Sequence, residues 1–215
     1  MSVNISAWNV VISATFFNPS VVCQHWLIKN KILEEADFLP GCIFSQALSQ
    51  VVSTKFLLIV TPEHLQLFPQ VPAADSIEEL NNSVIRIVKF LEHTPFVAAG
   101  INFNYELTPS DGDVGKATRA RFSGPSAIYS SFIDDDVRVG TYLSKNVIGA
   151  RLRLDVKPIT ADASGNSERI RLFFNFNKDL DPDNKPGGIV ELVDRWIEYL
   201  GIANEISGTL DREIP

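Results

Sequence analysis

The sequence alternates apolar and polar residues over two neighbouring stretches, VIGARLRLDVK at residues 147–157 and ERIRLFFNFN at residues 168–177. Successive side chains of a β-strand point to opposite faces of a sheet, so the alternation predicts two strands that each have one buried face. Turn-forming residues between the stretches predict that the strands pair as an antiparallel hairpin. The side chains predicted on its buried face are Leu152, Leu154, Val156, Ile170, Leu172 and Phe174.

Each half of the chain contains several strand-like stretches followed by a long amphipathic one. Residues 76–91 have helical apolar spacing, Ser76 and Glu79 match a capping box, and Pro95 lies just beyond the run. The other predicted strands are 7–17, 42–53, 55–60, 65–70, 96–107, 118–122, 127–133 and 137–143, and the other predicted helices are 19–36, 189–200 and a short tail near 206–210. This order favours an α+β fold, in which two or three amphipathic helices pack on a largely antiparallel sheet.

A polar stretch at residues 108–115 gathers turn formers between the two halves. It predicts a boundary between a first α+β half, residues 1–110, and a second, residues 111–215, which would be related subdomains. The alternative is one continuous domain in which this stretch is a long loop.

The composition excludes several classes of protein. The chain has 215 residues, a formal net charge of -7 and a pI of about 5.0, which disfavours binding to nucleic acid phosphates. The two cysteines, Cys23 and Cys42, form no Cys-x-x-Cys pair, which favours a reducing compartment. The sequence has no leader pattern at its N-terminus and no apolar run of membrane-spanning length, so we expect a cytoplasmic protein without a membrane partner.

Two stretches approach known ligand-binding motifs without matching them. The acidic run from Asp179 has the spacing of a calcium loop, but Asn184 stands where that loop needs glycine. Residues 111–118 contain the Gly-Lys pair of a phosphate-binding loop, but Ser110 stands at its first glycine position. The sequence therefore predicts no metal site and no cofactor.

Three Arg-x-Arg pairs are the most distinctive pattern in the chain. They are Arg119 with Arg121, Arg151 with Arg153, and Arg169 with Arg171. On a strand, residues i and i+2 share a face, so each pair would project two guanidinium groups together. Arginine forks suit carboxylates and phosphates, so one hypothesis is an anion-binding sheet face. The favoured alternative is a solvated outer face, because Asp155 lies on the same face and Glu168, Asp134 and Asp136 can compensate the charge.

The sequence has no catalytic spacing, which favours a non-enzymatic interaction or assembly subunit that binds a protein partner or self-associates. The second hypothesis is a protein that binds an anion or small molecule on the arginine face. The third is an enzyme whose site forms only in the fold. Its candidate residues are Asp134, Asp135, Asp136, Cys42, His25, His64 and His93.

Overall fold

The computed structural model describes residues 2–71, 76–124, 131, 134, 136–160, 168–183 and 185–212. Its strands are β1 (Ser2–Ala14), β2 (Ile43–Phe44), β3 (Ser49–Val52), β4 (Phe56–Val60), β5 (His64–Pro69), β6 (Phe96–Thr108), β7 (Thr141–Val147), β8 (Ala150–Ile159) and β9 (Arg169–Asp179). Its helices are α1 (Gln24–Lys29), α2 (Ser76–Phe90), α3 (Val114–Phe122), α5 (Lys185–Asp194) and α6 (Trp196–Arg212), with short 3-10 turns η1 (Pro19–Val21) and η2 (Glu35–Asp37).

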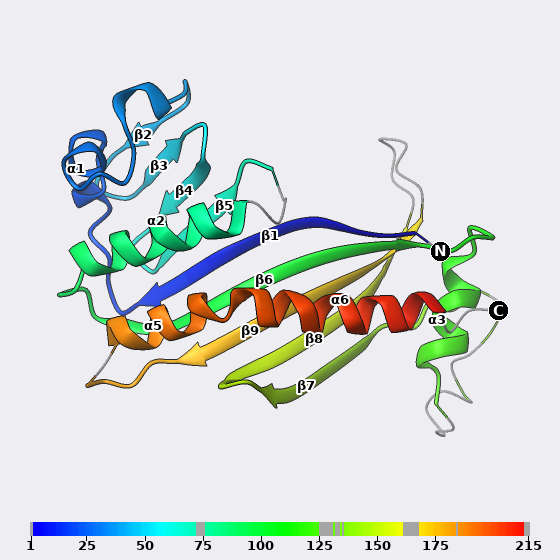
Figure 1. Ribbon diagram of the computed structural model, residues 1–215. Helices are drawn as coiled ribbons and strands as arrows, with labels where there is room; N and C mark the ends of the chain where they lie inside the picture. Colours follow the sequence, from blue (N-terminus) through cyan, green and yellow to red (C-terminus); the bar gives the residue numbers. More distant parts are fainter. Residues whose placement is uncertain are drawn as a thin grey trace.

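The nine strands form one antiparallel sheet in the order β2-β3-β4-β5-β1-β6-β9-β8-β7. Figure 1 shows α2, α5 and α6 on the same side of this sheet. The α+β fold with a largely antiparallel sheet is therefore confirmed. We call the side that carries these helices the covered face and the opposite side the open face.

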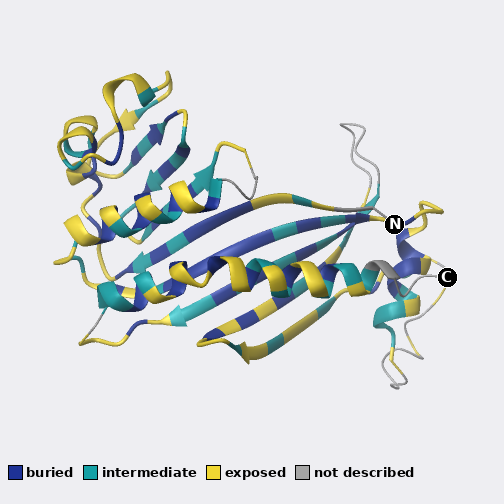
Figure 2. Cartoon of the chain, viewed as in Figure 1, coloured by how far each residue is buried: buried dark blue, intermediate teal, exposed yellow. Residues whose placement is uncertain are grey.

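Buried and less buried residues alternate along β8 and β9 (Figure 2). On β8 and β9, the apolar residues at every second position are buried on the covered face, including Leu152, Leu154 and Phe174. The residues between them, including Arg151 and Arg153, point to the open face. The hairpin predicted from the two alternating stretches is confirmed, with Leu154 paired to Phe174.

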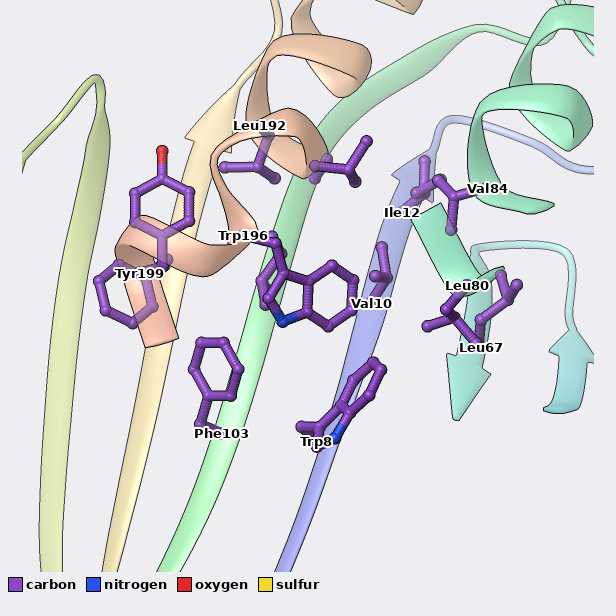
Figure 3. Packing of buried hydrophobic residues seen from close by; sticks show 14 of the residues in the cluster. Trp8, Val10, Ile12, Leu67, Leu80, Val84, Phe103, Leu192, Trp196 and Tyr199 are labelled. Carbon is purple, nitrogen blue, oxygen red and sulfur yellow. The ribbon is translucent and has the colours of Figure 1, made fainter. Parts of the chain in front are cut away.

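Aromatic residues join the covered face of the sheet to the helices (Figure 3). Trp196, at the start of α6, is fully buried and lies edge-on to Trp8 of β1, with ring centroids 4.5 Å apart. Phe103 of β6 packs against the same indole at 6.2 Å. Tyr199, one helical turn later, stacks on Phe176 of β9 at 4.6 Å. These contacts fix α6 across the central strands.

Two local predictions for the first half of the chain are confirmed. Helix α2 coincides with the predicted helix over residues 76–91, and its apolar stripe faces the core. Strands β4 and β5 match the strands predicted over residues 55–60 and 65–70, and they pair as an antiparallel hairpin with Val60 opposite Leu65. The capping box predicted from Ser76 and Glu79 is not formed as expected, because Ser76 is already the first helical residue and its hydroxyl donates to the Val71 carbonyl.

The strand predicted over residues 118–122 is wrong, because this stretch belongs to helix α3. The Asp113 carboxylate accepts a hydrogen bond from the Lys116 amide at 2.7 Å and caps the helix. Val114, Ala117 and Thr118 are buried at helical spacing. A cap and a short apolar face therefore outweigh the weak strand pattern.

The first predicted helix is also much shorter than expected. The chain forms η1 and α1, which ends at Lys29, and two residues later Lys31 has a φ of 55° in the left-handed region. Stretch 42–53 contains two short strands, β2 and β3, and β7 begins at Thr141, later than predicted. The strand predicted over 127–133 lies outside the described residues apart from Ser131, which is helical.

The sheet continues across the boundary predicted at residue 110. Strand β6 pairs with β9 from Ala98 and Asp179 to Leu107 and Ile170. Both halves therefore contribute neighbouring strands to one sheet. The division into residues 1–110 and 111–215 stays a prediction.

Candidate anion-binding site

A row of polar side chains crosses the open face at the middle of the sheet. Strand register places Asn9 of β1 beside Asn102 of β6, Asn102 beside Asn175 of β9, and Asn175 beside Arg153 of β8. The Asn102 amide donates to Asn9 Oδ1 at 3.0 Å, and the Asn175 amide donates to Asn102 Oδ1 at 2.6 Å. We call Asn9, Asn102 and Asn175 the asparagine ladder. Its hydrogen bonds fix the amide that lies next to Arg153.

A second polar row lies directly beside the ladder. It contains Asn146 of β7, Arg151 of β8, Asn177 of β9 and Gly100 of β6. A Cβ atom at Gly100 would lie 3.2 Å from Asn175 Nδ2 and 3.5 Å from Asn177 Oδ1. The two asparagine side chains therefore extend over the space that glycine leaves open.

A groove of about 660 Å³ lies beside these rows, along the β7–β8 turn, the start of β8 and the end of β9. Its polar lining comes from Asn146, Arg151, Arg153 and Asn177, with Lys178 and Asp179 also contributing. Arg151 and Arg153 are two residues apart on one strand, so their Cα atoms lie about 7 Å apart. Both guanidinium groups can therefore reach one carboxylate-bearing segment.

The charges of Arg151 and Arg153 are not neutralised by acidic contacts in the described part of the chain. Arg151 Nη1 donates to the neutral amide oxygen of Asn146 at 3.1 Å. The Arg153 side chain is exposed and makes no hydrogen bond or ion pair with another described residue. Nearby Asp155 pairs instead with Lys157 at 2.7 Å. This pair of arginines is the strongest candidate for binding an anion.

Arg169 and Arg171 also lie on the open face, but the structure places them elsewhere. Arg171 is four residues from Asn175 along β9, which is about 13 Å. Arg169 Nε lies 3.0 Å from Glu106 Oε1, and Arg171 Nη2 lies 3.9 Å from the same atom. The four arginines predicted to share one anion-binding face are therefore divided into two pairs, and Arg169 and Arg171 lie against Glu106.

Arg119 and Arg121 do not join the open face. They lie on α3, where residues two apart point in different directions, so the prediction that they share a strand face is wrong. Arg119 Nη1 donates to the Val137 carbonyl at 2.7 Å, and Arg121 Nε donates to the Leu210 carbonyl at 3.2 Å. Both contacts tie α3 to neighbouring backbone.

The hairpin turn before Arg151 has an unusual backbone. Ile148 and Gly149 connect β7 to β8 with φ values of 42° and 76°. A two-residue turn with two positive φ values favours Asn-Gly, whereas a β-branched residue in the left-handed region costs about 1–2 kcal/mol. The Ile148 carbonyl accepts hydrogen bonds from Tyr199 Oη at 3.0 Å and Arg195 Nη1 at 3.3 Å.

Relief of this strain gives a testable stability change. We expect Ile148→Asn to raise the free energy of unfolding by about 1 kcal/mol, because asparagine tolerates the left-handed region and the side chain is partly exposed. Urea unfolding of the two proteins measures the difference. Gly149→Ala provides the opposite control, because it replaces the glycine of the same turn and should destabilise the fold. A loss of stability in Ile148→Asn would contradict the assigned turn.

The residues considered for a catalytic site do not converge in the described part of the chain. Asp134 and Asp136 are both exposed. The hydrogen bond between their side chains lowers the pKa of Asp134 and raises the pKa of Asp136. Asp135 lies outside the described residues. Cys42 Sγ contacts the carbonyl oxygens of Leu39 and Val52 at 3.4 and 3.5 Å.

The three histidines lie on separate elements. His25 is exposed on α1, and the exposed His93 follows α2. The register of β1 and β5 places Ser13 beside His64, with Oγ and Nδ1 3.2 Å apart. Glu63 is 4.0 Å from the other ring nitrogen, with its side chain 81% exposed. This group lacks the buried orienting carboxylate of a hydrolase triad.

The asparagine ladder is the main feature of the site that sequence reasoning missed. Asn102 and Asn104, like Asn175 and Asn177, repeat at the strand period of two. That repeat places each pair on one face of its own strand, but only the register brings Asn9, Asn102 and Asn175 into contact.

Comparison with known proteins finds no family model that matches the chain, and no curated protein matches it significantly. None of the helices within the described residues combines the length and apolarity needed to cross a membrane. The functional assignment therefore depends on the geometry of the open face.

Proposed function

We propose that the protein is a non-enzymatic interaction subunit that binds an acidic segment of a partner protein on its open sheet face. The observation that carries this proposal is the pair Arg151 and Arg153, which project together into a polar groove without an acidic contact in the described structure. Arginine forks bind carboxylates through two parallel hydrogen bonds. Asn146 and Asn177 line the same groove and add amide groups.

The shape of the site favours a protein segment over a small molecule. Small-molecule sites are concave, mostly apolar and bury most of their ligand. Here the arginines are exposed on a sheet face, and the groove is open and lined by polar residues together with Val147, Ile148 and Ala150. An extended acidic segment can lie along the strands and contact both arginines without entering a deep cavity.

The overall charge supports selective recognition. With a net charge of -7, the chain repels polyanions except where basic residues are concentrated.

Cys23 and Cys42 are free thiols, which suits the expected cytoplasmic location. Self-association stays a separate prediction.

Two matched charge reversals test the proposal. We expect Arg153→Glu to weaken binding of a fluorescent oligo-glutamate peptide at least tenfold, because it replaces a fork with a repelling carboxylate. Arg171→Glu makes the same charge change on the same face, but next to Glu106, and should change the dissociation constant less than about threefold. Fluorescence anisotropy at fixed salt measures both constants.

Three controls accompany this comparison. Thermal unfolding verifies that each variant is folded at the assay temperature. Competition with inorganic phosphate shows whether a small anion occupies the same site. Equal weakening by the two reversals would contradict a specific site at Arg153, as would a wild-type protein that does not bind the peptide.

A further inference from the structure

The tip of the β7–β8 hairpin is tied to the helices on the covered face. Tyr199 of α6 and Arg195, just before α6, both donate to the Ile148 carbonyl. The Tyr199 side chain is buried, stacks on Phe176, and has its pKa raised by that burial. A buried tyrosine of the helical layer and the neighbouring arginine therefore hold one specific peptide group of the turn.

This turn determines where Arg151 and Arg153 point. Its two residues place Val147 opposite Ala150, and the same register places Arg151 opposite Asn146. A slip of one residue in an antiparallel pair moves every side chain to the other face. The positions of both arginines on the open face therefore depend on the turn keeping its two-residue form.

Ile148 does not favour this turn by itself. Its φ of 42° is disfavoured for a β-branched residue, whereas Gly149 adopts its φ of 76° freely. Strained backbone persists where surrounding contacts over-determine it, often beside binding sites. The two hydrogen bonds to the Ile148 carbonyl are such contacts, and the turn lines the groove that contains Arg151 and Arg153.

We propose that Tyr199 and Arg195 are positioning residues of the anion-binding site, which act by holding the Ile148–Gly149 turn from the covered face. This inference rests on the proposed function of Arg151 and Arg153. It adds that affinity at the open face is set in part by two residues of the helical layer that do not touch the bound segment.

A substitution and its second-site rescue test the inference. Tyr199→Phe keeps the ring that stacks on Phe176 and removes the hydroxyl that binds Ile148. We expect it to weaken binding of the oligo-glutamate peptide about 3- to 10-fold. Adding Ile148→Asn should restore affinity to within about twofold of wild type, because asparagine favours the turn without the clamp.

Tyr105→Phe is the matched control, because it removes another buried hydroxyl, which donates to Asn204 Oδ1 at 2.7 Å. It should leave the affinity unchanged when all variants are assayed well below their unfolding temperatures. A loss of peptide affinity in Tyr199→Phe that Ile148→Asn restores would support the clamp, by which we mean the hydrogen bonds from Tyr199 and Arg195 to the Ile148 carbonyl.

Two other results would overturn the inference, and they have different meanings. If the wild-type protein binds and Tyr199→Phe binds equally well, the clamp is rejected while the binding function stands. The same holds if Tyr199→Phe weakens binding and Ile148→Asn does not rescue it. If the wild-type protein does not bind the peptide, the proposed function fails and the inference fails with it.

Discussion

Replacement of Trp196 by alanine is expected to lower the free energy of unfolding by about 3–5 kcal/mol, because it removes a large side chain from the centre of the core. Trp196 is fully buried and packs edge-on against Trp8 of β1 and Phe103 of β6. Its loss would leave a cavity between α6 and the two central strands (Figure 3). Guanidinium unfolding followed by circular dichroism measures the change.

Trp196→Phe is the matched control for this prediction. The indole Nε1 is buried and has no hydrogen-bond partner among the described groups. Phenylalanine removes this unsatisfied donor and keeps an aromatic ring, so it should cost less than half of the alanine effect. Equal losses of the free energy of unfolding in Trp196→Ala and Trp196→Phe would contradict the importance of aromatic packing at this position.

Alkaline pH is expected to destabilise the fold through Tyr105. Burial raises the pKa of Tyr105 to about 12, from an ordinary value of 10.0, and the residue is only 2% exposed. The folded state therefore holds the phenol proton more tightly than the unfolded state does. The resulting stability is fully present below pH 10 and is lost as pH rises toward 12, by about 2–3 kcal/mol.

Denaturant unfolding between pH 9 and pH 12 tests this expectation about Tyr105. Tyr105→Phe should flatten the pH dependence of the free energy of unfolding. It should also lower that free energy at neutral pH, because the hydrogen bond to Asn204 is lost. Burial also raises the pKa of Tyr199, so a smaller pH dependence should remain in that variant. An unchanged slope in Tyr105→Phe would contradict the assignment.

The fold was predicted best where local periodicity and burial agree. In β8 and β9, residues such as Leu154 and Phe174 repeat at the strand period and are also buried against each other. In α2, the apolar stripe from Ile77 to Val88 has the helical period and faces the core. Such elements are stabilised by the same pattern that identifies them.

Prediction failed where tertiary context decided the local structure. Helix α3 is short and carries Arg119 and Arg121, so its apolar stripe is weak. Its burial depends on other parts of the chain, including the contact from Arg119 to the Val137 carbonyl. Just after α1, Lys31 likewise adopts a left-handed backbone at a position where the sequence offers no glycine to indicate it.

The candidate site could be predicted only in part for the same reason. Alternation shows that Arg151 and Arg153 share a face, but it does not give the stagger between β8 and β9. The observed register pairs Arg153 with Asn175 and leaves Arg171 beside Lys157. The asparagine ladder further requires β1, β6 and β9 to be neighbours, although Asn9 and Asn102 are 93 residues apart.

The most direct test of the binding site is an amide chemical-shift map of the protein during titration with the oligo-glutamate peptide. The account predicts that the largest shifts occur at residues 151–153 and 175–177, on neighbouring strands of the open face. Shifts concentrated at residues 169–171 and Glu106, or on the helices of the covered face, would contradict it.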